Sequence, residues 1–287
     1  MTVSAALPLG GALRARPRLL HSVRTVRVVW QRELLRFLHE RVRMGTTLLQ
    51  PLMFLFVLGA GLGGLTHRAY GVDFTTFVYP GALVMPVLFS AVMSAGSIVW
   101  DREFGFLREM LVAPVGRTAI VVGKALGGAT TATIQGAVVL ALARAAGVPY
   151  DPALMLTLLG EMALLAFMCA CFGVMVAARI SSLHAFMGVS QMAVQPLFFT
   201  SGAMFTLTAL PGWLAVVNRF NPLTYAVDPI RRAVFAHLHV SAAARAHYAP
   251  GVAWGGRQVP VWAELLIVAA TALIMLAVAG REFRDTQ

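Results

Sequence analysis

A segment of charged residues between Trp100 and Arg117 separates two long apolar runs and offers the first candidates for chemistry. If the segment is helical, at about 100° per residue, Trp100, Phe104 and Leu107 share one stripe. The other side then carries Asp101, Arg102, Gly105, Arg108 and Glu109. Such a helix can lie at a membrane surface and present its charged groups to a soluble partner. The pattern predicts a docking element over residues 100–117, and the alternative is a solvated loop that only orients its neighbours.

Glu161 is the one carboxylate that lies well inside an apolar run long enough to cross a membrane. An acid in hydrocarbon is costly, so it is either paired with a cation or kept for a function such as carrying a proton. Arg144, near the end of the preceding apolar run, is its nearest candidate partner in the sequence. We expect a structural ion pair between these two residues, and a proton relay is the alternative.

Two other apolar runs place soft or polar side chains on one face. These residues are Met85 and Phe89 in one run, and Gln191, Gln195 and Phe198 in the other. Amides in hydrocarbon must be paired or wetted, so the two glutamines should face protein or a cavity. A flexible Met/Phe wall opposite an amide stripe suits a pathway for amphipathic cargo. Hydrogen bonding between packed helices is the alternative role for the glutamines.

Motifs for catalysis or nucleotide binding are missing from the sequence. The phosphate-binding pattern G-x-x-x-x-G-K-[ST] is absent, because the sole Gly-Lys pair, Gly123-Lys124, is not followed by Ser or Thr. Neither H-E-x-x-H nor G-x-S-x-G occurs. The spacing of His237, His239 and His247 matches no strong metal motif. We therefore expect no active site, metal or cofactor in this chain.

The composition places these residues in a membrane protein. Of the 287 residues, 59% are hydrophobic and 12% are charged, whereas about 25% are charged in a typical soluble domain. Six apolar runs approach the roughly 20 residues that are needed to cross a bilayer. We place these spans at 45–65, 77–99, 118–143, 153–177, 185–207 and 260–279. The predicted fold class is an all-α polytopic membrane protein with six transmembrane helices.

Basic residues are distributed unevenly between the two sides of this arrangement. Sixteen of the 23 fall on the side that holds both termini and residues 100–117, and seven fall on the other side. Because Lys and Arg are enriched in cytoplasmic loops, both termini are predicted to be cytoplasmic. The net charge of +11 then reflects membrane topology, and no nucleic-acid partner is needed to explain it.

The chain on either side of the spans also carries recognisable patterns. Residues 1–22 lack periodicity and are predicted to be a mobile tail, before a transmembrane domain that covers residues 45–287. Between them, residues 23–44 repeat apolar side chains on one face and arginines on the other, which predicts an interfacial amphipathic helix. Residues 208–260 contain Asn221-Pro222 and Asp228-Pro229, each a capping residue before a proline. These two helix-start signals predict short re-entrant helices at the outer side.

Small residues predict where helices pack closely. Gly59 with Gly63, and Gly123 with Gly127, are spaced by four residues, which lets two helix backbones approach each other. Cys169 and Cys171 are two residues apart in an apolar run. They would point to different sides of a helix, so we expect them to be unpaired.

The sequence resembles the permease subunits of type-2 ABC exporters, with the closest resemblance to drug-resistance permeases of the daunorubicin-exporter type and to the nodulation-factor exporter permease. The resemblance covers nearly the whole chain after residue 23. It is carried by Arg-Glu-Phe-Gly at 102–105, Leu-Val-Ala-Pro-Val at 111–115, Phe-Asn-Pro-Leu-Thr-Tyr at 220–225 and Asp-Pro-Ile-Arg at 228–231. The order of the predicted elements is also the same.

This resemblance implies a half-transporter of the bacterial inner membrane in which two permease chains, identical or paralogous, form a pathway through the lipid bilayer. A cytoplasmic ABC ATPase subunit would bind ATP and Mg²⁺, and the permease itself would hold no cofactor. The implied coupling residues are Glu103, Phe104, Leu107, Arg108, Glu109 and Pro114, within a coupling helix at 100–117. The implied outer-gate residues are Asn221, Pro222, Tyr225, Asp228 and Arg231. The cargo would be a hydrophobic or amphipathic drug, lipid or lipid-linked glycan, and a proton-coupled secondary transporter that uses Glu161 is the alternative.

Overall fold

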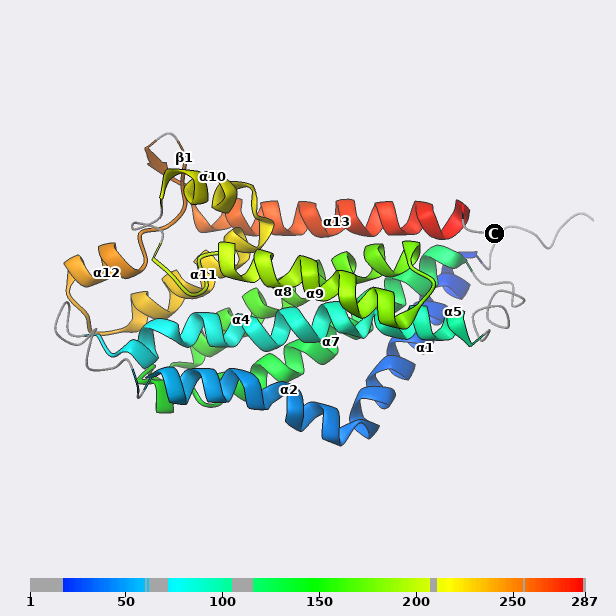
Figure 1. Ribbon diagram of the computed structural model, residues 1–287, viewed down its shortest axis with the longest axis horizontal. Helices are drawn as coiled ribbons and strands as arrows, with labels where there is room; N and C mark the ends of the chain where they lie inside the picture. Colours follow the sequence, from blue (N-terminus) through cyan, green and yellow to red (C-terminus); the bar gives the residue numbers. More distant parts are fainter. Residues whose placement is uncertain are drawn as a thin grey trace, which may run out of the picture.

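The computed structural model describes residues 18–59, 61, 72–104, 116–206, 211–254 and 256–285. Within these ranges the chain forms an elongated bundle of helices (Figure 1). The elements are α1 (Arg18–His39), α2 (Arg41–Met53), the π-helical turn η1 (Phe54–Leu58), α4 (Phe74–Ser94), α5 (Gly96–Glu103), α7 (Arg117–Leu140), the 3₁₀ turn η2 (Ala143–Ala146), α8 (Pro152–Arg179), α9 (Leu183–Thr200), α10 (Gly212–Phe220), α11 (Pro222–His237), α12 (Ala242–Tyr248), β1 (Ala253–Trp254), β2 (Arg257–Gln258) and α13 (Val261–Asp285).

The predicted helical class is confirmed, and three helices in the described ranges are long and apolar enough to cross a membrane. They are Phe74–Glu103, Pro152–Arg179 and Val261–Phe283. Helices α7 and α9 coincide with most of the predicted spans at 118–143 and 185–207. Both are less apolar, because α7 carries Lys124 and α9 carries two glutamines. The arrangement of six spans therefore stays a prediction.

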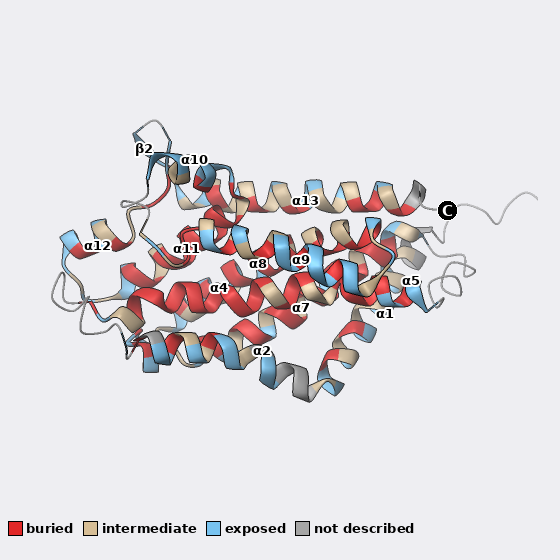
Figure 2. Cartoon of the chain, in the orientation of Figure 1, coloured by how far each residue is buried: buried red, intermediate tan, exposed pale blue. Residues whose placement is uncertain are grey.

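Helix α4 and its continuation α5 form the centre of the bundle. Every residue from Thr76 to Leu88 is buried, because α4 is enclosed mainly by α7 and α8 (Figure 2). A helix that is apolar on all sides can be enclosed in this way without burying unpaired polar groups. By contrast, α13 packs on α8 and leaves large apolar side chains such as Leu266, Leu273 and Ile274 exposed. Exposed apolar groups of this kind are suited to contact with lipid.

At one end of the bundle lie the ends of α5 and α8, the starts of α7 and α9, and the C-terminal end of α13 (Figure 1). Arg117 Nη1 donates a hydrogen bond to the Phe283 carbonyl at 3.2 Å, and Arg179 Nε donates to Glu282 Oε1 at 2.7 Å. The opposite end carries α10, α11, α12 and an antiparallel hairpin of β1 and β2, a hairpin that no pattern in the sequence predicted. The two helix ends that flank residues 105–115 therefore lie at the same end as the C-terminal helix end.

Small residues bring the helices together where the sequence predicts close approach. A Cβ atom at Gly123 would lie 2.8 Å from the Val29 Cβ, and one at Gly127 would lie 2.6 Å from the Glu33 Cβ, so α1 packs tightly on α7. A Cβ at Gly59 would collide with Thr75. Gly63 lies outside the described residues. The two cysteines are buried and unpaired, as predicted.

Helix α1 corresponds to the predicted interfacial helix, with different bounds. It begins at Arg18 and ends at His39, whereas the prediction placed it at 23–44. The chain bends at Glu40, whose φ and ψ of −86° and 53° are not helical, and α2 follows at once. Figure 1 shows α1 leaving one end of the bundle obliquely before this bend. The placement of α1 at a membrane interface stays a prediction.

The outer region follows only one of the two predicted helix starts. Asn221 Oδ1 accepts a hydrogen bond from the Leu223 N–H at 2.9 Å, and Pro222 opens α11 as its first residue. The second start was wrong, because Asp228 and Pro229 lie inside α11. Pro229 costs α11 one backbone hydrogen bond. Asp228 does not cap a helix, since its Oδ2 accepts from the Val252 N–H at 3.1 Å.

Candidate functional site

A cavity of about 550 Å³ lies between α1, α2, α4, α5, α7 and α9. Its apolar wall is formed by Met85, Pro86, Phe89, Met93, Phe186 and Met187. Its polar wall is formed by Glu33, Arg36, Glu40, Gln50, Ser97, Thr131, Gln135 and Gln191, among others. Pockets that bind small molecules typically range from about 300 to 1,000 Å³ and pair an apolar lining with a few polar groups. The cavity has both properties.

The structure brings together three of the five residues that the sequence analysis proposed for a pathway. Met85, Phe89 and Gln191 line the cavity. Gln195 and Phe198 lie further along α9, and they are not part of its lining. Phe198 is 2% exposed and belongs to the hydrophobic core. This part of α9 contacts α11, where Asn221 Nδ2 donates to the Leu197 carbonyl at 2.7 Å.

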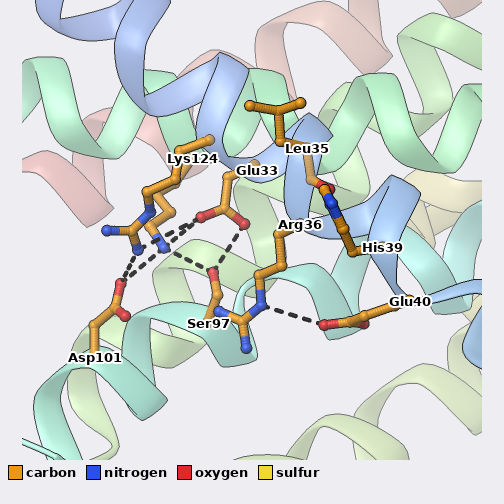
Figure 3. A network of polar contacts seen from close by, with 9 residues as sticks. Glu33, Leu35, Arg36, His39, Glu40, Ser97, Asp101 and Lys124 are labelled. Atoms are coloured by element: carbon orange, nitrogen blue, oxygen red, sulfur yellow. Dashed lines mark hydrogen bonds and ion pairs between the residues drawn. The ribbon is translucent and has the colours of Figure 1, made fainter.

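A polar cluster, buried except for Arg32 at its edge, borders the cavity where α1, α5 and α7 meet (Figure 3). We call it the Lys124 cluster, and its members are Glu33 and Arg32 of α1, Ser97 and Asp101 of α5, and Lys124 of α7. The Lys124 Nζ donates to Glu33 Oε1 at 2.6 Å, to Ser97 Oγ at 2.8 Å and to Asp101 Oδ2 at 3.0 Å. An ammonium group has three protons, so every donor of Lys124 has an acceptor.

The rest of the Lys124 cluster is equally well paired. The Ser97 hydroxyl lies 3.2 Å from Glu33 Oε2, and Arg32 Nη2 donates to Asp101 Oδ2 at 2.6 Å. The two carboxylates are thus balanced by two cations, which is the condition for burying charged groups in a low-dielectric interior. Lys124 is the only lysine in the sequence and lies in an apolar run. The position of Lys124 was the signal in the sequence for this cluster, because a charged residue inside an apolar run needs partners.

The predicted water-facing position of Asp101 is wrong, whereas the exposure of Trp100 and Phe104 is compatible with the predicted membrane-facing stripe. The prediction turned Trp100 and Phe104 toward the membrane and Asp101 toward water. In the structure Trp100 is 40% and Phe104 57% exposed, whereas Asp101 is 5% exposed. The reason is that α5 continues α4 into the bundle, where Lys124 and Arg32 hold the Asp101 carboxylate. The helix also ends at Glu103, so the described residues give no helix over 100–117 as a whole.

The predicted coupling residues fall partly within the described chain. Glu103 Oε2 accepts a hydrogen bond from the Leu183 N–H at 3.0 Å, which ties the end of α5 to the start of α9. The exposed Phe104 ring lies 4.5 Å from the Trp100 ring, measured between centroids. The other four coupling residues, Leu107, Arg108, Glu109 and Pro114, lie outside the described residues.

The predicted outer-gate residues all belong to the region where α11 meets α9, α10 and the hairpin. Asn221 Nδ2 also donates to Thr200 Oγ1 at 2.9 Å. The Tyr225 hydroxyl donates to the Arg219 carbonyl at 2.7 Å and accepts from Trp254 Nε1 at 3.0 Å. These bonds connect α11 to α9, to the end of α10 and to the hairpin.

Arg231 is a buried cation of this region. Its Nη2 donates to the Gly202 carbonyl at 2.7 Å and to the Ala203 carbonyl at 2.9 Å, and its guanidinium lies 4.9 Å from the centre of the Phe77 ring. Burial lowers the pKa of Arg231 to about 10, while the nearby Asp228 carboxylate acts in the opposite direction. The side chain therefore stays cationic at neutral pH and fixes α11 to the turn that follows α9.

Glu161 is not paired with Arg144. Arg144 is exposed, and the charged groups that act on Glu161 are the carboxylates of Asp228 and Glu264. Its Oε2 has no hydrogen-bond partner within the described part of the chain. Arg232 Nη1 lies 3.6 Å from Asp228 Oδ2 and 3.7 Å from Glu264 Oε1, so it supplies positive charge to this acidic region. The predicted ion pair is wrong because Arg144 belongs to the short η2 turn and is exposed, whereas Glu161 is buried in α8.

This correction gives a prediction about stability. Glu161→Gln should leave the midpoint of thermal unfolding in detergent unchanged or raise it, because the change removes a carboxylate that has carboxylate neighbours. Arg144→Ala should have no effect on the midpoint. Breaking a buried ion pair would instead cost about 3–5 kcal/mol. A large and similar loss of stability in both variants would restore the ion pair that the structure rejects.

Comparisons with known proteins agree on one family. The profile of the ABC-2 type transporter family matches residues 24–235. Nodulation protein J of Rhizobium leguminosarum bv. trifolii is 31% identical over 192 residues, which cover 66% of this chain and 73% of that protein. The ycf38 protein of Cyanophora paradoxa is 30% identical over 188 residues, which cover 64% of this chain and 65%, just under two thirds, of ycf38. The inner membrane transport permease YadH of Escherichia coli strain K12 is 24% identical over 208 residues, covering 71% of this chain and 80% of YadH.

Proposed function

The chain belongs to the ABC-2 type transporter family, and on this premise we propose that it is the permease subunit of an ATP-driven exporter. Family membership confirms the resemblance seen in the sequence and makes the chain a transport permease, a membrane subunit and not an enzyme. The proposal adds the source of energy, the kind of cargo and the partner chains.

The cavity between α4 and α9 is the observation that carries the proposal. Met85, Phe89 and Met187 give it a flexible apolar wall, and Gln191 and Gln135 add polar groups. Methionine and phenylalanine side chains adapt to apolar ligands of different shapes, whereas the amides hydrogen-bond to a polar group. We propose that the cavity is the first binding site of a hydrophobic or amphipathic cargo, such as a drug, a lipid or a lipid-linked glycan.

ATP is proposed to bind a cytoplasmic ABC ATPase subunit together with Mg²⁺. This sequence contains no phosphate-binding loop, so we assign it no cofactor of its own. The docking segment is proposed to comprise Glu103, Phe104 and the residues that follow them up to Pro114. In its support, the exposed Phe104 marks the point where the chain leaves α5, at the end of the bundle that also holds the C-terminal end of α13.

A second permease chain and a bacterial inner membrane complete the proposal. Met192 of α9 is 81% exposed, and Gln191 beside it is exposed as well. An exposed amide on an apolar helix is costly in lipid, so a second copy or a paralogue is proposed to cover this face of α9. Both termini are proposed to be cytoplasmic, with α10, α11 and α12 as gate helices on the outer side.

Reconstitution into proteoliposomes tests the proposal. We expect the permease, reconstituted with its cognate ATPase, to move rhodamine 6G, a hydrophobic cationic dye, only when ATP and Mg²⁺ are present. Dye movement is followed by fluorescence quenching. An ATPase whose catalytic glutamate is changed to glutamine is the matched control, and it should bind the permease without supporting transport.

The dependence of transport on a proton gradient distinguishes this proposal from a proton-coupled transporter. Transport that stops when a protonophore is added, and continues in the absence of ATP, would identify a proton-coupled transporter. Glu161 is the residue proposed for that mechanism, but it does not line the cavity. We therefore expect the protonophore to leave ATP-driven transport intact.

A further inference from the structure

The Lys124 cluster borders the cavity and includes residues of the two helices, α5 and α7, whose ends flank residues 105–115. Glu33 and Ser97 line the cavity, and both are bonded to Lys124. Asp101, the third partner of Lys124, lies two residues before the end of α5 at Glu103. Lys124 belongs to α7, which begins on the other side of residues 105–115. The cluster therefore touches the cavity and both helices that flank the docking segment.

The bonding pattern makes these groups interdependent. Lys124 is 4% exposed, so its ammonium group depends on its protein acceptors. A weaker bond to Glu33 or Ser97 must then be offset by a closer approach to Asp101, because an uncompensated buried charge is strongly disfavoured. Asp101 is also held by Arg32 of α1, so such a change moves α5 relative to both α1 and α7.

We propose that the Lys124 cluster relays the presence of cargo in the cavity to the end of α5 at Glu103 and the start of α7 at Arg117. This inference rests on the proposed function and adds a requirement on the cargo. Glu33 can only accept hydrogen bonds, so a cargo that reaches it needs a donor such as a hydroxyl or an ammonium group. When this donor binds Glu33 or Ser97, Lys124 shifts toward Asp101, and the ends of α5 and α7 move with it. Lys124 and Asp101 are thus positioning residues, which act on the docking segment without contacting cargo.

Asp101→Asn should weaken the relay without affecting cargo binding, since Asp101 does not line the cavity. The variant is reconstituted with the ATPase, and ATP hydrolysis is measured with and without rhodamine 6G, which carries N–H donors. We expect hydrolysis without dye and the Kd for the dye to stay near the wild-type values. The stimulation by dye should fall about tenfold, the effect of losing one hydrogen bond to a charged group.

Two serine variants keep the test valid if Asp101→Asn does not fold. Ser97 and Ser90 both line the cavity, and only Ser97 belongs to the Lys124 cluster. Ser97→Ala keeps the charges of the cluster balanced and should lose most of the dye stimulation. Ser90→Ala removes the same group from the same wall and should retain it.

The outcomes distinguish the relay from the function on which it rests. Equal stimulation in Ser97→Ala, Ser90→Ala and wild type would overturn the relay and leave the exporter intact. An Asp101→Asn variant whose stimulated and unstimulated hydrolysis fall by the same factor would show a role in folding only. If the wild-type complex hydrolyses ATP and no dye stimulation occurs, the cavity is not a cargo site for this class of compound, and the relay is rejected with it.

Discussion

Replacing Arg231 with methionine should destabilise the protein by about 3–5 kcal/mol, the cost of removing one member of a buried charged group. Methionine has a similar length, but it cannot donate to the Gly202 and Ala203 carbonyls or stack as a cation on Phe77. The Asp228 carboxylate would also lose a nearby positive charge. Thermal unfolding of the purified protein in detergent, followed by tryptophan fluorescence, measures the effect.

A matched control removes an arginine that the fold does not enclose. Arg257 is exposed on β2, so Arg257→Met should leave the midpoint of unfolding unchanged. Arg231→Lys should lie between the wild type and Arg231→Met, because lysine keeps the charge and loses the planar fork that reaches two carbonyls. Equal midpoints for Arg231→Met and Arg257→Met would show that the buried guanidinium does not fix α11 in place.

Local patterns in the sequence were sufficient for much of the fold. The apolar runs that became α4, α8 and α13 are long, and length and hydropathy are properties of a continuous segment. The start of α11 could be predicted because the Asn221 side chain caps a backbone N–H only two residues away. The spacing of Gly123 and Gly127 marked close packing, although it could not show that the partner would be α1.

Contacts between distant segments were the part that the sequence did not reveal. Lys124 is bonded to residues that lie 91, 27 and 23 positions away, and no periodicity within one helix selects such partners. The same cluster explains why Asp101 is buried, whereas the prediction placed it on a water-facing side. The prediction assumed that a lone amphipathic helix sorts its residues between lipid and water, whereas Asp101 is held by partners on two other helices.

The predicted ion pair between Glu161 and Arg144 was wrong for a related reason. The partner of Glu161 was sought among neighbours in the sequence, but the charges that surround it come from α11 and α13. The residues predicted for the pathway on α9 show what helical periodicity alone cannot determine. Helical periodicity correctly placed Gln191 on a shared face with Gln195, but it could not show where along α9 the cavity ends and contact with α11 begins.

A double substitution in the docking segment should abolish cargo-stimulated ATP hydrolysis. Arg108 and Glu109 lie outside the described residues, so the prediction rests on their position in the charged segment and on the proposed function. Each can make charge-assisted hydrogen bonds to the ATPase, worth about 1.5–3 kcal/mol. Losing both in Arg108→Ala with Glu109→Ala should weaken docking by about two to four orders of magnitude.

The measurements are copurification with the ATPase and ATP hydrolysis with and without rhodamine 6G. Neither residue belongs to a described part of the cavity, so the Kd for the dye and the folding of the permease should stay unchanged. Gln191→Ala is the matched control with the opposite pattern, because Gln191 lines the cavity. It should keep the ATPase bound and change which compounds stimulate hydrolysis. If the double variant instead keeps full stimulated turnover, residues 105–115 do not dock the ATPase, and coupling must pass through other residues at the same end of the bundle.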